Sequence, residues 1–127
     1  MDTDTMPYRM PNAVFASTSQ NKLQGYLLNS NHPVGMHKAK ILRDVLGFHY
    51  QNWDKLSDRI YNAVQTSPVT RMAKTAYGSK YEIPVDIKGE KDRSLVLRTV
   101  WQVDNDSQIP RLITIVFDEK ARGKNDA

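Results

Sequence analysis

The hydrophobic residues of this chain change their spacing once, and that change limits the folds it can adopt. Between residues 20 and 65 they recur with the 3.6-residue period of an amphipathic helix, and between residues 81 and 117 they alternate with the period of two typical of a half-buried strand. Runs of helices followed by runs of strands indicate an α+β fold. We therefore expect two to three N-terminal helices packed on one face of a three- to four-stranded antiparallel meander sheet.

The helical part contains clear start and stop signals. Ser19 and Asn52 are residue types favoured at helix N-termini, and Gly47 is typical of a left-handed C-terminal cap. Along the second helix the apolar stripe is broken by one charged residue, Lys38. The helices are expected at residues 20–28, 34–46 and 53–65.

The strand part is less uniform. The run at 94–103 is the longest and is the expected centre of the sheet, and Pro84 within the run at 81–87 predicts an edge position or a bulge. Residues 69–77 fit either an edge strand or a mobile loop. The remaining strand is expected at residues 111–117.

Composition sets the domain boundaries. A chain of 127 residues is long enough for one hydrophobic core. We expect a disordered arm or linker at residues 1–18, a single α+β domain at 19–117 and a disordered charged tail at 118–127, because both ends lack periodic apolar residues.

The residue inventory excludes several classes of function. The chain has no cysteine, which excludes disulfides and thiolate metal sites, and its three histidines form no His-x-x-x-His pair. No metal or cofactor is therefore expected. No apolar run is long enough to cross a membrane and no signal peptide is evident, so the expected location is the cytoplasm. The net charge of +4 is compatible with nucleic-acid binding.

The loop that precedes the second helix is the strongest candidate site. A helix N-terminus presents unpaired N–H groups and a positive dipole end, which together favour an anion such as phosphate. Gly35 would let a phosphate approach closely, and histidine titrates near neutral pH. The candidate residues of this half-site are Asn31, His32, Gly35, His37, Lys38 and Lys40.

The other half of the site is expected on the sheet. Arg98 lies between two valines on the central strand and Arg111 opens the next strand, so each needs an anionic partner. That partner is either a ligand or a carboxylate such as Glu82 or Asp86. Trp101 and Thr114 have two possible roles. They pack between the sheet and the helices, or they bind the substrate, in which case an exposed Trp101 would stack on a base.

Histidine, lysine and arginine without a metal suit RNA cleavage through the 2′-hydroxyl group. A histidine moves the proton while lysine and arginine stabilise the charged phosphorane. No P-loop, Gly-x-Ser-x-Gly or zinc pattern is present.

Four spaced motifs carry a family resemblance: Tyr26-Leu27-Leu28-Asn29-x-x-His32-Pro33-x-Gly35-x-x-Lys38-Ala39, Tyr77-Gly78-x-x-Tyr81, Arg98-Thr99-x-Trp101 and Pro110-Arg111-Leu112-Ile113-Thr114. They resemble a bacterial domain family of unknown function found as C-terminal domains of polymorphic toxins and as small stand-alone, often cyanobacterial, toxin-like proteins. The element order more distantly resembles the metal-independent ribonuclease superfamily of barnase, EndoU, colicin E-type RNases and RelE. Ser30 departs from the pattern, where a proline is expected.

The resemblance implies a toxin-like RNA endonuclease of a toxin–antitoxin or polymorphic toxin system, held in check by a cognate antitoxin or immunity protein. His32 would be the general base or acid, Lys38 and Arg98 would hold the scissile phosphate, and Arg111 would assist. Delivery from a larger secreted toxin is one implied route to the cytoplasm. Two alternatives stay open: a non-catalytic module that binds nucleic acid or protein, and an interaction protein whose charged residues form only structural ion pairs.

Overall fold

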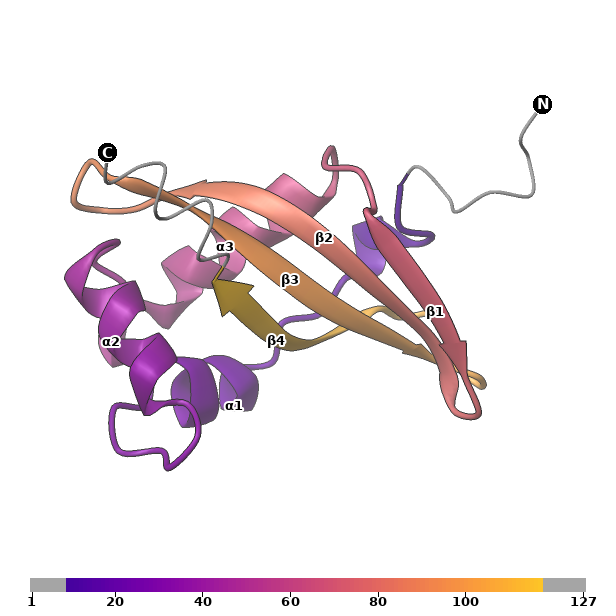
Figure 1. Cartoon of the computed structure of the whole chain (residues 1–127), viewed down its shortest axis with the longest axis horizontal. Helices are drawn as coiled ribbons and strands as arrows, with labels where there is room; N and C mark the ends of the chain where they lie inside the picture. Colours follow the sequence, from indigo (N-terminus) through magenta and orange to yellow (C-terminus); the bar gives the residue numbers. More distant parts are fainter. Residues whose placement is uncertain (1–8, 118–127) are drawn as a thin grey trace.

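Four antiparallel strands form a single meander sheet in the order β1-β2-β3-β4 (Figure 1). The computed structural model describes residues 9–117. The strands are β1 (Arg71–Thr75), β2 (Gly78–Lys88), β3 (Ser94–Asp104) and β4 (Arg111–Phe117). Before them come α1 (Gln20–Lys22), the π-helical turn η2 (Leu23–Leu27), α2 (Met36–Asp44) and α3 (Trp53–Val64), with short 3₁₀ turns η1 (Ala13–Phe15) and η3 (Tyr50–Asn52).

The helices cover one face of this sheet, and one continuous hydrophobic cluster joins the two layers. The alternating residues of β3 that face the helices are buried, among them Leu97 and Trp101, which are both 0% exposed. They join Leu42 of α2 and Leu56 and Ile60 of α3 in the same cluster. The predicted α+β architecture, with N-terminal helices on one face of an antiparallel meander, is confirmed.

The long β2–β3 ribbon is the frame of the sheet. The two strands pair over their full lengths, from Gly78 opposite Asp104 to Lys88 opposite Ser94. Strand β1 pairs only with the first part of β2, from Gly78 to Glu82. The ambiguous segment at 69–77 is thus an edge strand followed by a tight turn.

Pro84 lies in an inner strand but at a position that is locally an edge. It faces Arg98 of β3 on one side, whereas the β1 ladder has already ended at Glu82 on the other. The missing N–H of proline therefore interrupts no ladder there. The expectation of an edge strand or a bulge is therefore wrong for β2, and the inner strand tolerates the proline because β1 is short.

Two helices differ from the expected ranges. The first continues from α1 into η2, where the Leu28 N–H donates to the Leu23 carbonyl at 2.7 Å. The second begins at Met36 rather than residue 34, because Pro33, Val34 and Gly35 form the turn that leads into it. None of the helices among the described residues is long and apolar enough to span a membrane.

Residues 9–18, expected as part of a disordered arm, are packed onto the domain. Met10 is 2% exposed and belongs to the main hydrophobic cluster. The Gln65 side chain donates to the Ala13 carbonyl at 2.8 Å, and Ser17 forms a parallel bridge with Arg111 at the start of β4. The domain therefore extends N-terminally past the expected boundary at residue 19. The expected arm at 1–8 and tail at 118–127 lie outside the described residues.

Replacing Met10 tests this correction. Because its side chain is buried in the core, Met10→Ala should lower the free energy of unfolding by about 2–5 kcal/mol. Val14, which is 61% exposed in the same segment, is the matched control, and Val14→Ala should change stability by less than about 0.5 kcal/mol. Chemical denaturation of both variants measures the difference, and equal stability would show that residues 9–18 do not belong to the core.

Candidate functional site

Tyr26, in the π-helical turn η2, is the centre of the polar cluster that the loop, α2 and β4 form together. Its hydroxyl oxygen lies 3.2 Å from Thr114 Oγ1 on β4. The ammonium group of Lys38 donates to the same hydroxyl at 3.5 Å. A residue from each layer of the fold thus meets at one phenol.

The ammonium groups of two lysines lie close to the Tyr26 ring. Lys22 Nζ lies 5.2 Å and Lys38 Nζ 5.8 Å from the ring centroid, within the range of cation–π contact. The contact with Tyr26 explains why a lysine occupies the apolar stripe of α2: its stem runs along the core edge and its charge rests against an aromatic face. Within residues 9–117, neither lysine forms an ion pair with a carboxylate.

These neighbours change the acidity of the phenol. The hydrogen bond with Thr114 lowers the pKa of Tyr26, burial opposes that shift, and the charges of Lys38 and Lys22 lower the pKa further. The net pKa lies below the ordinary value of 10.0. A phenol with a lowered pKa beside two ammonium groups can give up its proton more readily than an ordinary tyrosine, so it is a candidate base.

His32 holds the loop in place with its ring and its backbone. Its Nδ1 accepts the backbone N–H groups of Val34 and Gly35, both at 3.0 Å, and its carbonyl accepts that of Met36 at 3.0 Å. Nδ1 therefore carries no proton, and the neutral ring carries its proton on Nε2. The imidazole packs edge-on to Tyr26 with centroids 5.1 Å apart.

This arrangement changes the expected anion site at the start of α2. The amides of Val34, Gly35 and Met36 already have His32 as their acceptor, so these three do not point free at a ligand. Gly35 allows close approach as expected, but of protein backbone: a Cβ built there would lie 2.3 Å from the Tyr26 carbonyl oxygen and 2.8 Å from its Cδ1. The glycine is what lets the loop lie against Tyr26.

The other loop candidates are on the surface. The exposed Asn31 donates its N–H to the Asn29 side chain at 2.9 Å in a local turn. His37 and Lys40 are exposed on the outer side of α2, where Lys40 pairs with Asp44 at 2.9 Å. Together with Arg43 this lysine lowers the pKa of Asp44 to about 2, mainly by hydrogen bonding.

The two predicted strand arginines are bound elsewhere. Arg98 Nη1 donates to Glu82 at 3.2 Å, which is one of the two carboxylates named as structural partners. Arg111 pairs with Asp104 at 3.1 Å, and this hydrogen-bonded pair lowers the pKa of that aspartate. The structure brings His32, Lys38 and Thr114 together at Tyr26, whereas both arginines form ion pairs with carboxylates of the sheet.

Trp101 cannot serve as the exposed base-stacking residue proposed as its alternative role. Its side chain is 0% exposed, and its indole N–H donates to the Thr99 hydroxyl at 2.8 Å. It is a core residue between the sheet and the helices.

Sequence reasoning missed Tyr26 and Lys22 as site residues. Helix phase placed Tyr26 beside Leu23 and Leu27, so it was counted as a packing residue. The usable signal was that Lys22 and Lys38, far apart in sequence, each lie close in helical phase to the core-facing stripe. Within the described residues, no group of three or more His, Asp and Glu side chains is placed to share a metal ion.

Comparison with known proteins gives one match. Residues 9–119 match the family model described as Domain of unknown function (DUF6883), a match that begins at the first residues packed on the domain. No curated protein and no solved structure matches the chain.

The tight contact at Gly35 yields a stability prediction. Gly35→Ala should lower the free energy of unfolding by about 1–3 kcal/mol, because the new methyl group overlaps the backbone of Tyr26. Gly25 is the matched control, since a Cβ there meets nothing within 4 Å and Gly25→Ala should stabilise the helix by about 0.5–1 kcal/mol. Thermal unfolding measures both, and a neutral Gly35→Ala would show that the loop does not close on Tyr26.

The hydrogen bond to Thr114 yields a pH prediction. Thr114→Val removes the largest influence that lowers the pKa of Tyr26, so this pKa should rise towards 10.0. Ultraviolet titration of phenolate formation, read as the difference from Tyr26→Phe, measures it. Thr70→Val, which alters an exposed hydroxyl on the edge of the sheet, should leave the curve unchanged. An unchanged curve in Thr114→Val would contradict the described environment of the phenol.

Proposed function

The chain belongs to the family described as Domain of unknown function (DUF6883), and we propose that it is a toxin-like, metal-independent RNA endonuclease. The observation behind the proposal is the phenol of Tyr26 with its lowered pKa, which faces Lys38 and Lys22. The two lysines have no carboxylate partner in residues 9–117, so their charges are available to a phosphate. A base beside unpaired cations is what cleavage through the 2′-hydroxyl group requires.

The proposed reaction needs only groups of the chain, the RNA and solvent water. The phenolate of Tyr26 takes the proton of the 2′-hydroxyl, whose oxygen attacks the adjacent phosphorus. The bond to the 5′-oxygen breaks and this oxygen takes a proton from water; the resulting hydroxide then takes the proton back from Tyr26 and regenerates the phenolate and the water. The products are a 2′,3′-cyclic phosphate and a 5′-hydroxyl end. Lys38 and Lys22 stabilise the extra negative charge of the phosphorane.

His32 has a different part in this scheme from the general base expected from sequence. Because Nδ1 accepts two backbone N–H groups, Nε2–H is the ring's remaining polar group. It can donate a hydrogen bond to a non-bridging phosphate oxygen without disturbing the loop. His32 is thus proposed to fix the loop and to orient the phosphate.

The biological setting is proposed with the activity. The substrate is RNA, the site of action is the cytoplasm, and a cognate antitoxin or immunity protein restrains the enzyme. In this proposal the chain acts either as the delivered domain of a polymorphic toxin or as the toxin of a stand-alone toxin–antitoxin pair.

Inducible expression in a bacterium tests the proposal. The wild-type chain should arrest growth and fragment RNA. Tyr26→Phe should lower the cleavage rate of the purified protein by about 10²–10⁴-fold, as expected for loss of a general base. Lys38→Ala should lower it by about 10²–10³-fold through lost charge stabilisation. Tyr77→Phe, which makes the same tyrosine-to-phenylalanine change at a 79% exposed tyrosine outside the cluster, should retain full activity.

The outcome that would overturn the proposal is equally plain. If purified wild-type protein leaves total RNA intact, or if Tyr26→Phe cleaves as fast as wild type, the chain is not this enzyme. His32→Ala is not diagnostic by itself, because it also removes the acceptor that holds two loop amides.

A second candidate is a non-catalytic module that binds nucleic acid or protein. Lys22 and Lys38 favour it, because neither has a carboxylate partner in residues 9–117 and both could bind a polyanion without cleaving it. The ion pairs Arg98–Glu82 and Arg111–Asp104 favour instead the third alternative, an interaction protein whose charged residues form structural ion pairs. Salt-sensitive RNA binding without cleavage would support this candidate.

A further inference from the structure

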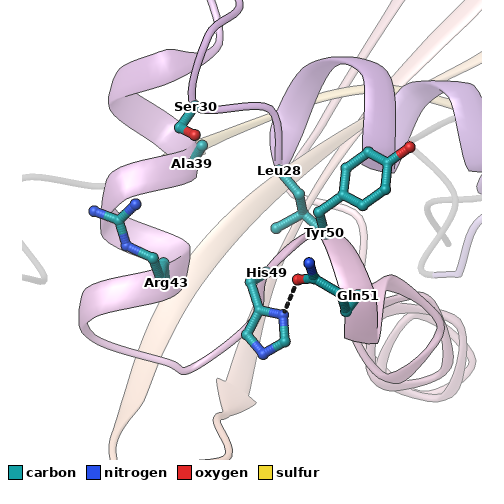
Figure 2. Close-up of a pocket in the computed structure, with 7 residues that line it drawn as sticks. All are labelled: Leu28, Ser30, Ala39, Arg43, His49, Tyr50 and Gln51. Carbon is teal, nitrogen blue, oxygen red and sulfur yellow. Dashed lines mark hydrogen bonds between the residues drawn. The ribbon is translucent and has the colours of Figure 1, made fainter.

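A hollow lies beside the loop, and the proposed chemistry uses none of the residues that line it. It has a volume of about 210 Å³ and is formed by the end of η2 with the loop, by α2 and by the turn at η3 (Figure 2). We call it the η3 cleft. Its lining residues are Leu28, Ser30, Ala39, Arg43, His49, Tyr50 and Gln51.

Aromatic and apolar side chains form part of the lining of the η3 cleft. Tyr50 is 53% exposed, so part of its ring is accessible to a ligand. Figure 2 shows the side chains of Tyr50 and Arg43 on opposite sides of Leu28. Leu28 and Ala39 are both buried and supply apolar surface between them.

The turn that carries Tyr50 is held in place. The Gln24 side chain donates to the Tyr50 carbonyl at 2.8 Å, and the Asn52 side chain accepts the His49 N–H at 2.7 Å. His49 Nδ1 lies 2.9 Å from Gln51 Oε1, as the dashed line in Figure 2 marks. The aromatic ring therefore stands on a braced backbone, which reduces the entropy lost on binding.

Polar groups remain available around the cleft. In the described part of the chain, the Ser30 hydroxyl and the amide nitrogen of Gln51 have no hydrogen-bond partner. The Nε–H of Arg43 donates to the Asp44 carboxylate at 3.0 Å. The cleft thus offers both donors and acceptors beside an aromatic face, the combination that recognises a nucleobase in single-stranded RNA.

A bare anion fits the cleft less well. Asp44 pairs with both Arg43 and Lys40, so its carboxylate offsets one of their two positive charges. A phosphate or sulfate would also make no use of Tyr50 or of the apolar surface. The lining therefore favours a planar ring over a charged tetrahedral group.

The cleft is also within reach of the catalytic cluster. Ser30 is two residues from His32, so their Cα atoms are at most about 7 Å apart. A neighbouring hollow of about 270 Å³ shares Ser30 and Arg43 with the cleft and adds His37 and Lys40 to its rim. A short RNA strand could place its phosphate at Tyr26 and a flanking base in the cleft.

We propose that the η3 cleft is a base-binding subsite that holds one nucleobase of the RNA, stacked on Tyr50, next to the cleaved phosphate. The proposal rests on the proposed RNA-cleaving function, because it makes the base part of that substrate. It assigns Tyr50 as a specificity residue that contacts the base and takes no part in proton transfer. Gln51 and Ser30 supply the hydrogen bonds that distinguish one base from another.

Titration of the whole chain with the four nucleoside 5′-monophosphates, monitored by NMR, tests the subsite. Ribose 5-phosphate is the control ligand, because it has the same sugar and phosphate but no base. At least one nucleotide should bind about tenfold more tightly than ribose 5-phosphate, and Tyr50→Ala should remove that advantage, in line with the worth of stacking on one aromatic ring. Tyr77→Ala, which removes a 79% exposed tyrosine from the β1–β2 turn, should bind like wild type.

The outcomes separate this proposal from the function it rests on. Equal binding of ribose 5-phosphate and every nucleotide, or equal nucleotide affinity of Tyr50→Ala and Tyr77→Ala, overturns the subsite even if RNA is cleaved. Tyr50-dependent nucleotide binding supports the subsite even if RNA stays intact. In that case the intact RNA refutes only the proposed cleavage. If RNA is cleaved, the base preference at the cut should be lost in Tyr50→Ala and kept in Tyr77→Ala.

Discussion

The closure of the loop onto Tyr26 is the contact on which the arrangement of this domain depends. Gly35 lies so close to the Tyr26 carbonyl that no side chain fits between them, and His32 secures the loop from within by accepting two of its amides. The phenol of the same tyrosine reaches across to Thr114 on β4. One residue thereby joins the first helix, the loop and the edge of the sheet, and the polar cluster forms where these elements meet.

The architecture could be predicted because each of its elements is encoded locally. The switch from helical to alternating spacing is visible residue by residue, so α3 and β4 lie within a residue of their expected ranges. Pro84 is an exception: it predicted an edge strand or a bulge, whereas β2 is an inner strand that tolerates the proline because β1 ends before reaching it. Met10 shows the limit, since nothing near it in sequence indicates the core it packs into.

The site was only partly predictable, because a charged group's partner depends on distant elements. The loop and Lys38 could be singled out from helix phase alone. That Lys38 rests on Tyr26, that Arg98 is held by Glu82 and that Arg111 is held by Asp104 are outcomes of register and packing. Helix phase could not show what the Tyr26 hydroxyl contacts, because its partner Thr114 lies 88 positions away in the chain. The proposed catalytic group is therefore a tyrosine and not the histidine expected from sequence.

The central claim is that the phenol of Tyr26 cleaves RNA without a metal, and the chemistry of the new RNA ends tests it most directly. Purified protein should be incubated with a defined RNA in the presence of EDTA, and the fragments analysed by mass spectrometry. The account predicts 2′,3′-cyclic phosphate and 5′-hydroxyl ends that form with wild-type protein and are lost with Tyr26→Phe. Fragments ending in a 3′-hydroxyl, or cleavage abolished by EDTA and indifferent to Tyr26→Phe, would contradict it.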